Sequence, residues 1–561
     1  MIAKMKHLDL ICLASDGDAT LSALRDLGAV HLDFSAASGA EVAAAKGDIS
    51  DAENAVNLIR KARGKARREE LDIRERGVGE ILALGEDRER LCTERDRLER
   101  EIKTYEPYGD FDPELARKLL ERGIDIADRL PPKLPEMRLS KMRDKLSRVV
   151  GRIGIDDAKL AASDDAAILR KSPELADRMA FAAARELLED KGAVRVVSGW
   201  IPEAQVARLK SCAHDASWGF LLRDPAAGET PPTLIEPPKM FRPVKALFVS
   251  LGIAPAYTEA DVSVPFMCYF SLFFAMLVGD GAYGGIFLAA TLAMRKKLPR
   301  SWFILLTVFS SATVLWGVLS NTWFGAQIPW LAELPTVKWL ADPSYHNMML
   351  LCFTIGVSHL MLARIWNGVC RLPDSTSIAE FGWAGVLLFM YFVTNSIVGI
   401  FSGIPSWAFW TFGVSLVAVF GFSVKPSELK TRGAELGMLP LNIMSALGDI
   451  ISYVRLFAVG LASVKVAENF NSMATGLVAG ADAVWQKALL SVAMVAILVV
   501  GHGLNLAMAG LSILVHAVRL NTLEFSNHKG VSWAGYAFSP FRKHVSVAKQ
   551  VDTRYGQLKE E

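Results

Sequence analysis

The chain has 561 residues, of which 51% are hydrophobic and 22% are charged, and its formal net charge is only +2. Acidic and basic residues are interleaved along the charged part, which argues against a nucleic-acid partner. The six cysteines are scattered without metal-ligand spacing, a pattern that is typical of reduced thiols and argues against a disulfide framework.

The N-terminal part is rich in charged side chains, and its apolar alternation predicts an α/β domain. We expect a strand at 8–13, a helix at 21–27 and a second strand at 30–34. The opening apolar stretch is short and alternating, so we interpret it as the first strand and not as a signal peptide. A further strand ends at residues 199–202 and leads into a new helix.

Between these elements, residues 48–105 have the composition of a long charged helix. Leu84, Leu91 and Leu98 recur every seven residues, which predicts a coiled-coil seam with a charged outer face. A second helical stretch at 165–190 is the candidate for the antiparallel partner. A proline-rich connector then leads to a domain boundary near residue 260.

Beyond that boundary, long apolar runs replace the charged sequence. Eight apolar segments lie at roughly 264–279, 281–295, 301–323, 346–369, 379–402, 406–424, 437–474 and 484–526. The last two exceed the ~20 residues that a perpendicular transmembrane helix needs, which predicts steep tilt or ends that leave the bilayer.

The distribution of basic residues orients these segments. If the N-terminal domain is cytoplasmic, the inside loops carry Arg295, Lys296, Lys297, Arg300, Arg371, Lys425, Lys430 and Arg432, and the outside loops carry only Lys338. This is the positive-inside asymmetry, and it predicts that both termini are cytoplasmic. The predicted fold is a cytoplasmic α/β domain with a long antiparallel coiled coil (1–260), an all-α membrane domain of eight transmembrane helices (261–530) and a cytoplasmic tail (531–561).

Signatures of soluble enzymes do not occur in the sequence. It contains no GxxxxGK[ST] loop, no HExxH and no GxSxG, and nothing in it points to a cofactor or a bound metal. We therefore expect that the polypeptide is not an enzyme on its own.

Ionisable residues instead lie deep inside the last two apolar segments. The seventh contains Asp449, Arg455, Lys465 and Glu468, and the eighth contains His502, His516, Arg519 and Glu524. A charge at the bilayer centre costs about 3 to more than 10 kcal/mol, depending on the scale, so each needs water or a partner. Arginine cannot lose its proton to escape this cost.

Helical phase groups these residues. At about 100° per residue, Asn505, Ser512, His516 and Arg519 share one face of the eighth segment. Ser445, Asp449, Ser452 and Ser463 lie within about 60° of one another on the seventh, next to Arg455. Singly, each residue has a structural alternative, because arginines snorkel to headgroups and serine or histidine can join helices by hydrogen bonds. Together the two polar stripes indicate an ion path that faces another protein.

The segment 448–474 resembles the a/I subunit family of V-type and A-type ATPases. The hallmark S-Y-x-R-L-(W/F)-A-L-x-L-A of that family is matched by Ser452, Tyr453, Arg455, Leu456, Phe457, Ala458 and Leu461-Ala462. Residues 265–285 resemble the first membrane motif of the family, and LVHAVRLNTLEF at 514–525 resembles its second arginine motif. GWIPEAQ, TPPTLIEPP and PAYTEAD are similar to its motifs before the membrane domain, so the resemblance covers nearly the whole chain.

The resemblance to prokaryotic members implies a non-catalytic stator subunit in the plasma membrane, which couples H⁺ or Na⁺ translocation to ATP hydrolysis or synthesis. It implies that Arg455 and Arg519 face a rotating proteolipid c-ring whose subunits each bring a carboxylate. The further partners implied are peripheral stalk subunits of the E/G type, bound to the N-terminal domain, and a central-stalk base subunit. The candidate half-channel residues are Ser445, Asp449, Ser452, Ser463, Glu468, Asn505, Ser512, His516 and Glu524.

The sequence departs from eukaryotic members at two positions. Ser463 stands where they have a histidine, and Ala509 stands where they have a glutamate, so their proton relay cannot be transferred to this chain. Asn505 or water is a candidate substitute. Two other classes remain as alternatives, a stand-alone secondary ion transporter and a membrane-anchored scaffold. A transporter predicts internal membrane repeats, which the sequence does not have.

Overall fold

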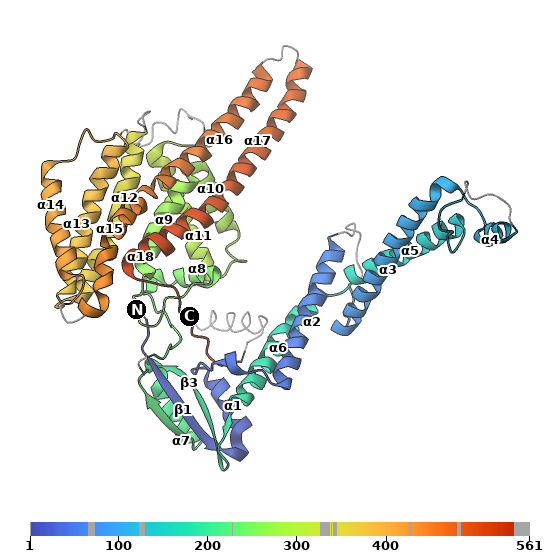
Figure 1. Cartoon of the computed structure of the whole chain (residues 1–561), viewed down its shortest axis with the longest axis horizontal. Helices are drawn as coiled ribbons and strands as arrows, with labels where there is room; N and C mark the ends of the chain where they lie inside the picture. Colours follow the sequence, from blue (N-terminus) through green and yellow to red (C-terminus); the bar gives the residue numbers. More distant parts are fainter. Residues whose placement is uncertain are drawn as a thin grey trace. The chain divides into compact units, whose positions relative to one another are not determined.

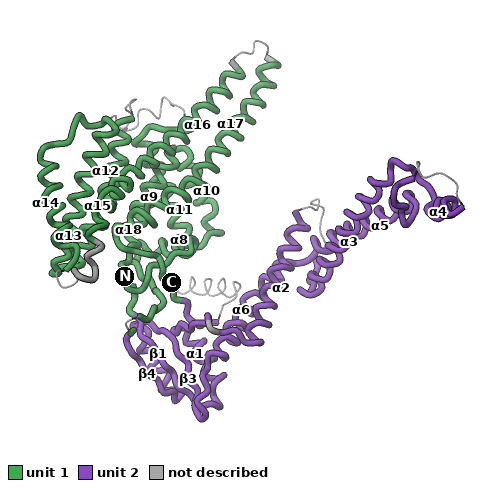
Figure 2. The backbone as a smooth tube through the Cα atoms, viewed as in Figure 1, with its two compact units in different colours: residues 1–4, 226–538 green, residues 5–225, 539–561 purple. Residues whose placement is uncertain are grey.

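The computed structural model describes residues 2–64, 73–122, 130–226, 228–325, 337, 339, 345–425, 429–479 and 484–543. The chain divides into two compact units (Figure 2). The sheet unit comprises Met5–Pro225 with Ser539–Glu561, and the apolar unit comprises Met1–Lys4 with Ala226–Phe538. Lys338 and most of the predicted C-terminal tail, from residue 544 onward, lie outside the described residues.

The sheet unit contains an antiparallel sheet in the order β2-β3-β1-β4. β1 (Met5–Leu13) pairs with β3 (Val194–Pro202) and β4 (Gly219–Arg223), and β2 (Glu189–Asp190) pairs with β3. The helices α1 (Gly17–Leu27) and α7 (Val206–Asp215) contribute to the same core. This core contains Leu8, Leu10, Leu21, Leu24, Val197, Ile201 and Leu209. The predicted first strand, the first helix and the strand ending at 199–202 are therefore confirmed.

The predicted strand at 30–34 is wrong. Only His31 forms a bridge, to Trp200, and the chain turns into a short 3₁₀ helix at Phe34–Ala36. The side chain of Asp33 accepts a hydrogen bond from the backbone N–H of Ser35 and thereby caps this turn. A local side-chain hydrogen bond of this kind competes with a strand ladder.

The C-terminal end of the described chain returns to this part of the sheet unit. The backbone N–H of Phe541 donates to the carbonyl of Val30 at 2.7 Å, and Nδ1 of His31 lies 3.0 Å from the backbone nitrogen of Ser539. The Phe541 side chain is buried in the core beside β1 and α1. We call these contacts the C-terminal clip.

Two antiparallel helix hairpins extend from the sheet (Figure 1). In the first, α2 (Ala40–Arg63) lies against α6 (Asp165–Glu186), and the Arg63–Asp165 ion pair at 2.7 Å joins opposite ends of the two helices. In the second, α3 (Val78–Tyr105) lies against α5 (Leu139–Ala161). A short helix, α4 (Pro113–Glu121), follows α3.

The described part of 48–105, whose composition predicts helix, forms two helices with different partners. The stretch 165–190 does supply a returning helix, but that helix, α6, pairs mainly with α2. Leu91 and Leu98 face α5, where they are buried against Val149 and Ile153. The apolar seam is therefore present, while a sustained coiled coil stays a prediction.

The apolar unit is helical. Its helices before the final pair are α8 (Val244–Leu251), α9 (Ser263–Val278), α10 (Gly281–Ala293), α11 (Arg300–Ser320), α12 (His346–Arg371), α13 (Thr376–Ile397) and α14 (Ser406–Phe422). The final pair is α15 (Leu429–Ile451) followed by α16 (Val454–Ala479), and α17 (Val484–Ser512) followed by π-helical turns and α18 (Ser526–Lys529). α16 and α17 lie side by side (Figure 1).

Five of the described helical stretches are long and apolar enough to cross a membrane. They are Arg300–Ser320, His346–Arg371, Thr376–Ile397, Leu436–Val478 and Trp485–Lys529. α9 and α10 qualify only as a pair, bent by 119° where Gly279 adopts a left-handed conformation and Asp280 caps α10. α14 is apolar but shorter. A multi-pass membrane protein follows from these helices, and the count of eight spans stays a prediction.

Candidate functional site

Arg455 lies at a break between two helices. α15 ends at Ile451, α16 begins at Val454, and Ser452 and Tyr453 form the turn between them. The predicted seventh segment is therefore interrupted immediately before Arg455, whose backbone N–H donates to the carbonyl of Ser452 at 3.3 Å.

The ring of Tyr453 holds this turn in place. Tyr453 is fully buried, and its hydroxyl lies 2.9 Å from Nδ1 of His359 on α12. Gly356, one turn earlier on α12, leaves room for the ring, because a Cβ at that position would lie 2.5 Å from Cγ of Tyr453. Packing against α12 therefore fixes where Arg455 enters α16.

Arg519 lies between two π-helical turns, Ile513–Ala517 and Leu520–Phe525. Its Nε atom lies 3.3 Å from Oε1 of Glu524, five residues further along the chain. In an α-helix, residues five apart point about 140° away from each other, whereas a π-helix closes its turn over five residues. The π-helical geometry thus brings Glu524 round to the side of Arg519.

Glu524 also contacts Arg455. Nη2 of Arg455 lies 3.3 Å from the same Oε1 atom, so one carboxylate oxygen joins both guanidinium groups. The Glu524 side chain is 4% exposed, whereas those of Arg455 and Arg519 are 23% and 53% exposed. We call these three residues the arginine–glutamate cluster.

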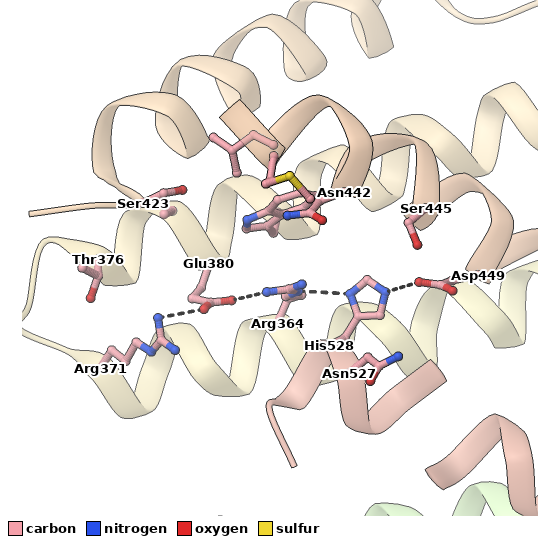
Figure 3. A pocket seen from close by; sticks show the side chains of 14 residues that line it. Arg364, Arg371, Thr376, Glu380, Ser423, Asn442, Ser445, Asp449, Asn527 and His528 are labelled. Atoms are coloured by element: carbon pink, nitrogen blue, oxygen red, sulfur yellow. Dashed lines mark hydrogen bonds and ion pairs between the residues drawn. The ribbon is translucent and has the colours of Figure 1, made fainter. Parts of the chain in front are cut away.

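A pocket of about 580 Å³ lies among α12, α13, α15 and α18 (Figure 3). A row of polar side chains crosses it: Arg371 to Glu380 at 2.9 Å, Glu380 to Arg364 at 3.1 Å, Arg364 to His528 at 3.1 Å and His528 to Asp449 at 3.0 Å. Ser445 and Asn442 also line the pocket. Two of the sequence-predicted residues, Ser445 and Asp449, are thus brought to one cavity.

The partners of Asp449 in this pocket are not among the residues predicted from the sequence. Arg364 and Glu380 are charged residues inside the fourth and fifth predicted apolar segments, and that was the signal which could have identified them. His528 lies just beyond the eighth segment, where hydropathy gave no signal.

A second polar group links α10, α16 and α17. The hydroxyl of Ser463 donates to Oδ1 of Asn505 at 3.0 Å, and Nδ2 of Asn505 donates to the Tyr283 hydroxyl at 3.1 Å. That hydroxyl lies 2.6 Å from Nδ1 of His502, whose Nε2 lies 3.1 Å from Oδ1 of Asn471. Since Nδ2 of Asn471 donates to a backbone carbonyl, the hydrogen bonds between the side chains run from Ser463 toward Asn471, while Nδ2 of Asn505 also donates back to the Ser463 carbonyl at 2.9 Å.

The remaining candidates, Glu468, Ser512 and His516, form no hydrogen bond with these groups within the described part of the chain. Glu468 forms an exposed ion pair with Lys465 at 2.7 Å. Ser512 precedes the first π-helical turn, and His516 lies inside it with a buried Nδ1 that has no hydrogen-bond partner among the described residues. The π-helical turns change the helical phase on which the stripe of the eighth segment was based, and the stripe stays a prediction.

Nothing in the described part of the chain resembles a metal site, since no cluster there brings together three His, Cys, Asp or Glu side chains suited to an ion. What the site does offer is two permanent cations beside a carboxylate. The Ser463–Asn505–Tyr283 group and the pocket of Asp449 are separate polar features of the same unit.

No protein-family model matches the chain. The chain is 27% identical to V-type ATP synthase subunit I 1 of Treponema pallidum, in an alignment that covers 97% of this chain and 100% of that protein. It is 33% identical over 369 residues to V-type ATP synthase subunit I of Borreliella burgdorferi, covering 62% of this chain and 60% of the relative. It is 24% identical to A-type ATP synthase subunit I of Methanocaldococcus jannaschii, of which it covers 54%. The chain thus spans somewhat more than half of the latter two proteins.

Proposed function

We propose that this chain, a homologue of the V-type and A-type ATP synthase subunit I proteins, is the membrane stator subunit of such a complex. In this role it forms two ion half-channels against a proteolipid ring and couples H⁺ or Na⁺ translocation to ATP hydrolysis or synthesis. It performs no nucleotide chemistry of its own. The full-length alignment with the Treponema protein supports membership of the complex.

The observation that carries the proposal is the convergence of Arg455 and Arg519 on one carboxylate oxygen. Two guanidinium groups keep their charge in an apolar surrounding and stabilise the ionised form of any carboxylate that comes near. A ring carboxylate arriving there releases its ion. The fixed charge also prevents ions from passing directly between the two half-channels.

The pocket of Asp449 and His528 supports a half-channel that opens toward the side of the inside loops. At about 580 Å³ it has room for many waters, each of which takes about 30 Å³ in the liquid. Ser445, Asp449 and Glu380 supply oxygen atoms along its wall. The adjacent basic residue Arg371 belongs to the cytoplasmic loops in the predicted topology.

The hydrogen-bonded chain from Ser463 to Asn471 supports the other half-channel. Ser463 stands where eukaryotic members have a histidine, and here it binds Asn505, which in turn binds Tyr283. Tyr283 and His502 are the titratable members of the chain. They take the place of the histidine and the glutamate of the eukaryotic proton relay, where this chain has Ser463 and Ala509.

The hairpins of the sheet unit are the proposed binding surface for the peripheral stalk subunits of the E/G type, with the central-stalk base as a further contact. Outside the apolar seams, their surfaces carry ion pairs such as Arg97–Glu101 and Glu94–Lys145, which leave polar surface for a partner. Together with the eight-span topology and cytoplasmic termini in the plasma membrane, this domain organisation remains part of the proposal.

The test is the variant Arg455→Ala in the purified complex. We expect the complex to retain its ring and to lose ATP-driven ion uptake in reconstituted vesicles. Arg295→Ala, an exposed arginine in the same unit, is the control and keeps uptake. Normal uptake by an assembled Arg455→Ala complex would overturn the mechanism. Purification of the wild-type chain without a proteolipid ring would favour a stand-alone transporter instead.

A further inference from the structure

The arginine–glutamate cluster carries an unbalanced charge. Arg455 and Arg519 contribute two permanent positive charges, and Glu524 is the one carboxylate among the described residues that contacts both. With Glu524 ionised the cluster has a net charge of +1, and without Glu524 it would be +2.

Glu524 is more deeply buried than either of its two arginine partners. Its neighbour Phe525 is 1% exposed and stacks on His359 with 4.4 Å between ring centroids. Leu520, on the same π-helical turn, is fully buried. By contrast, half of the Arg519 side chain is exposed. We therefore expect the Arg519 guanidinium to move more readily than Glu524.

The contacts of Glu524 are partial. Both arginines use the same oxygen at 3.3 Å, whereas strong charge-assisted hydrogen bonds are about 2.7–2.9 Å long. Oε2 of Glu524 is buried and has no hydrogen-bond partner among the described residues. Each guanidinium has five N–H donors, so both keep donors for a second carboxylate. An arriving carboxylate can thus bind the arginines while Glu524 stays in place.

We propose that Glu524 is a charge-balancing residue, which holds the two arginines between visits of the ring carboxylates and limits the positive charge that each carboxylate meets. This inference rests on the proposed function. A carboxylate leaves the arginines only after it has taken up the coupling ion. Each nearby positive charge stabilises its ionised, empty form, so a cluster of +2 retains it longer than a cluster of +1. Glu524 therefore sets how readily the ring carboxylate is released.

Other titratable or charged groups surround the cluster and enter its ion dependence. They are Tyr269 on α9, His359 on α12, Asp449 on α15, Tyr453 in the turn, His516 on the π-helical turn and His528 on α18. None of them changes in the variants below, so the test isolates the charge at position 524.

The experiment compares Glu524→Gln with the wild type in the assembled complex, reconstituted into vesicles. Glutamine keeps the size and hydrogen-bonding capacity of the side chain but removes its charge. ATP-driven ion uptake at neutral pH is expected to fall about tenfold. It recovers when the concentration of the coupling ion, H⁺ or Na⁺, is raised by about a factor of ten, the equivalent of one pKa unit.

Asp374→Asn is the control, because Asp374 forms an exposed ion pair with Lys425 at 2.7 Å; its ion dependence stays that of the wild type. Glu524→Asp retains the charge, and its ion uptake is expected to depend on the concentration of the coupling ion as in the wild type. This variant keeps the proposal testable even if the glutamine variant does not assemble. A loss of activity that is equal at all ion concentrations would indicate a structural role and overturn the proposal. Unchanged ion uptake by Glu524→Gln would also overturn the proposal. The same holds if Glu524→Asp needs a different concentration of the coupling ion from the wild type. Failure of the proposed function itself is distinguishable, because Arg455→Ala would then pump normally.

Discussion

Asp449 and His528 lie 79 positions apart in the chain, yet Oδ2 of Asp449 and Nε2 of His528 are 3.0 Å apart in the pocket. Arg364 donates to the other ring nitrogen of His528, and an arginine has no acceptor. The proton of a neutral His528 therefore lies on Nε2 and points at Asp449. The pair is a donor–acceptor contact of defined direction at the wall of the proposed half-channel.

Removing the Asp449 charge tests this part of the path. We expect Asp449→Asn to reduce ATP-driven ion uptake about tenfold or more. The pocket loses the negative charge of Asp449, and His528 loses a charged hydrogen-bond acceptor. The complex should remain assembled. Uptake by reconstituted vesicles is measured beside Asp374→Asn, and equal rates for the two variants would contradict a role for Asp449.

Tyr283→Phe removes the hydroxyl at the centre of the hydrogen-bonded chain. Nδ1 of His502 then loses its partner. The buried Asn505 keeps its hydrogen bonds to Ser463 but loses the acceptor of one amide N–H, at a cost of about 1–3 kcal/mol. We expect a lower thermal unfolding temperature together with slower ion uptake. Tyr391→Phe, whose hydroxyl lies 3.0 Å from Thr354, is the matched control. Wild-type uptake by Tyr283→Phe would exclude this chain from the path.

The position of Arg455 depends on space at Gly356. In Gly356→Ala, the new Cβ would lie 2.5 Å from the Tyr453 ring, so the turn that precedes Arg455 must shift. We expect impaired ion uptake without any change of charge. Gly413→Ala is the control, because no atom lies within 4 Å of a Cβ at that position. Equal uptake by the two alanine variants would show that the turn tolerates displacement.

Acid should weaken the C-terminal clip. Burial lowers the pKa of His31 below its usual value, although the Ser539 backbone and Asp33 oppose this shift. The unfolded chain therefore binds more protons than the folded clip as the pH falls through about 6.5, and stability decreases in that range. Hydrogen exchange at the Phe541 amide, corrected for its intrinsic rate, should accelerate below that pH. In His31→Asn this acceleration should be absent, and its persistence would point to another group.

The seam of the second hairpin can be tested in the same complex. Leu91→Ala leaves a cavity against Val149 and Ile153 and is expected to cost about 2–5 kcal/mol of local stability. Faster hydrogen exchange along α3 and α5 would report this loss. Leu115→Ala, at a 58% exposed leucine, serves as the control. If stalk subunits bind this hairpin, the first variant also weakens their retention.

The elements of the fold that follow from a local sequence pattern were predicted correctly. β1, α1 and β3 follow from alternation and periodicity, and the candidate arginines follow from the cost of a charge in an apolar segment. The strand at 30–34 failed because the Asp33 side chain caps a turn there. α5 was missed because Gly151 and Gly154 lower the helix propensity of its sequence.

The site itself depends on contacts between distant segments. The break before Arg455 contains neither glycine nor proline, and it arises where the Tyr453 ring packs on α12. The pairing of Arg519 with Glu524 needs π-helical turns, which phase arithmetic at 100° per residue cannot represent. The partners of Asp449 come from helices whose approach no sequence spacing encodes.

The C-terminal clip carries a topological consequence. It ties residues 539–541 to Val30 and His31, so the chain enters and leaves the apolar unit from the same folded unit. Both flanks must then be on one side of the membrane, and the number of crossings between them is even. The five long helical stretches alone would give an odd number. Among the described helices, α9, α10 and α14 are the candidates to complete an even count, and the eight crossings predicted from the sequence are an even number.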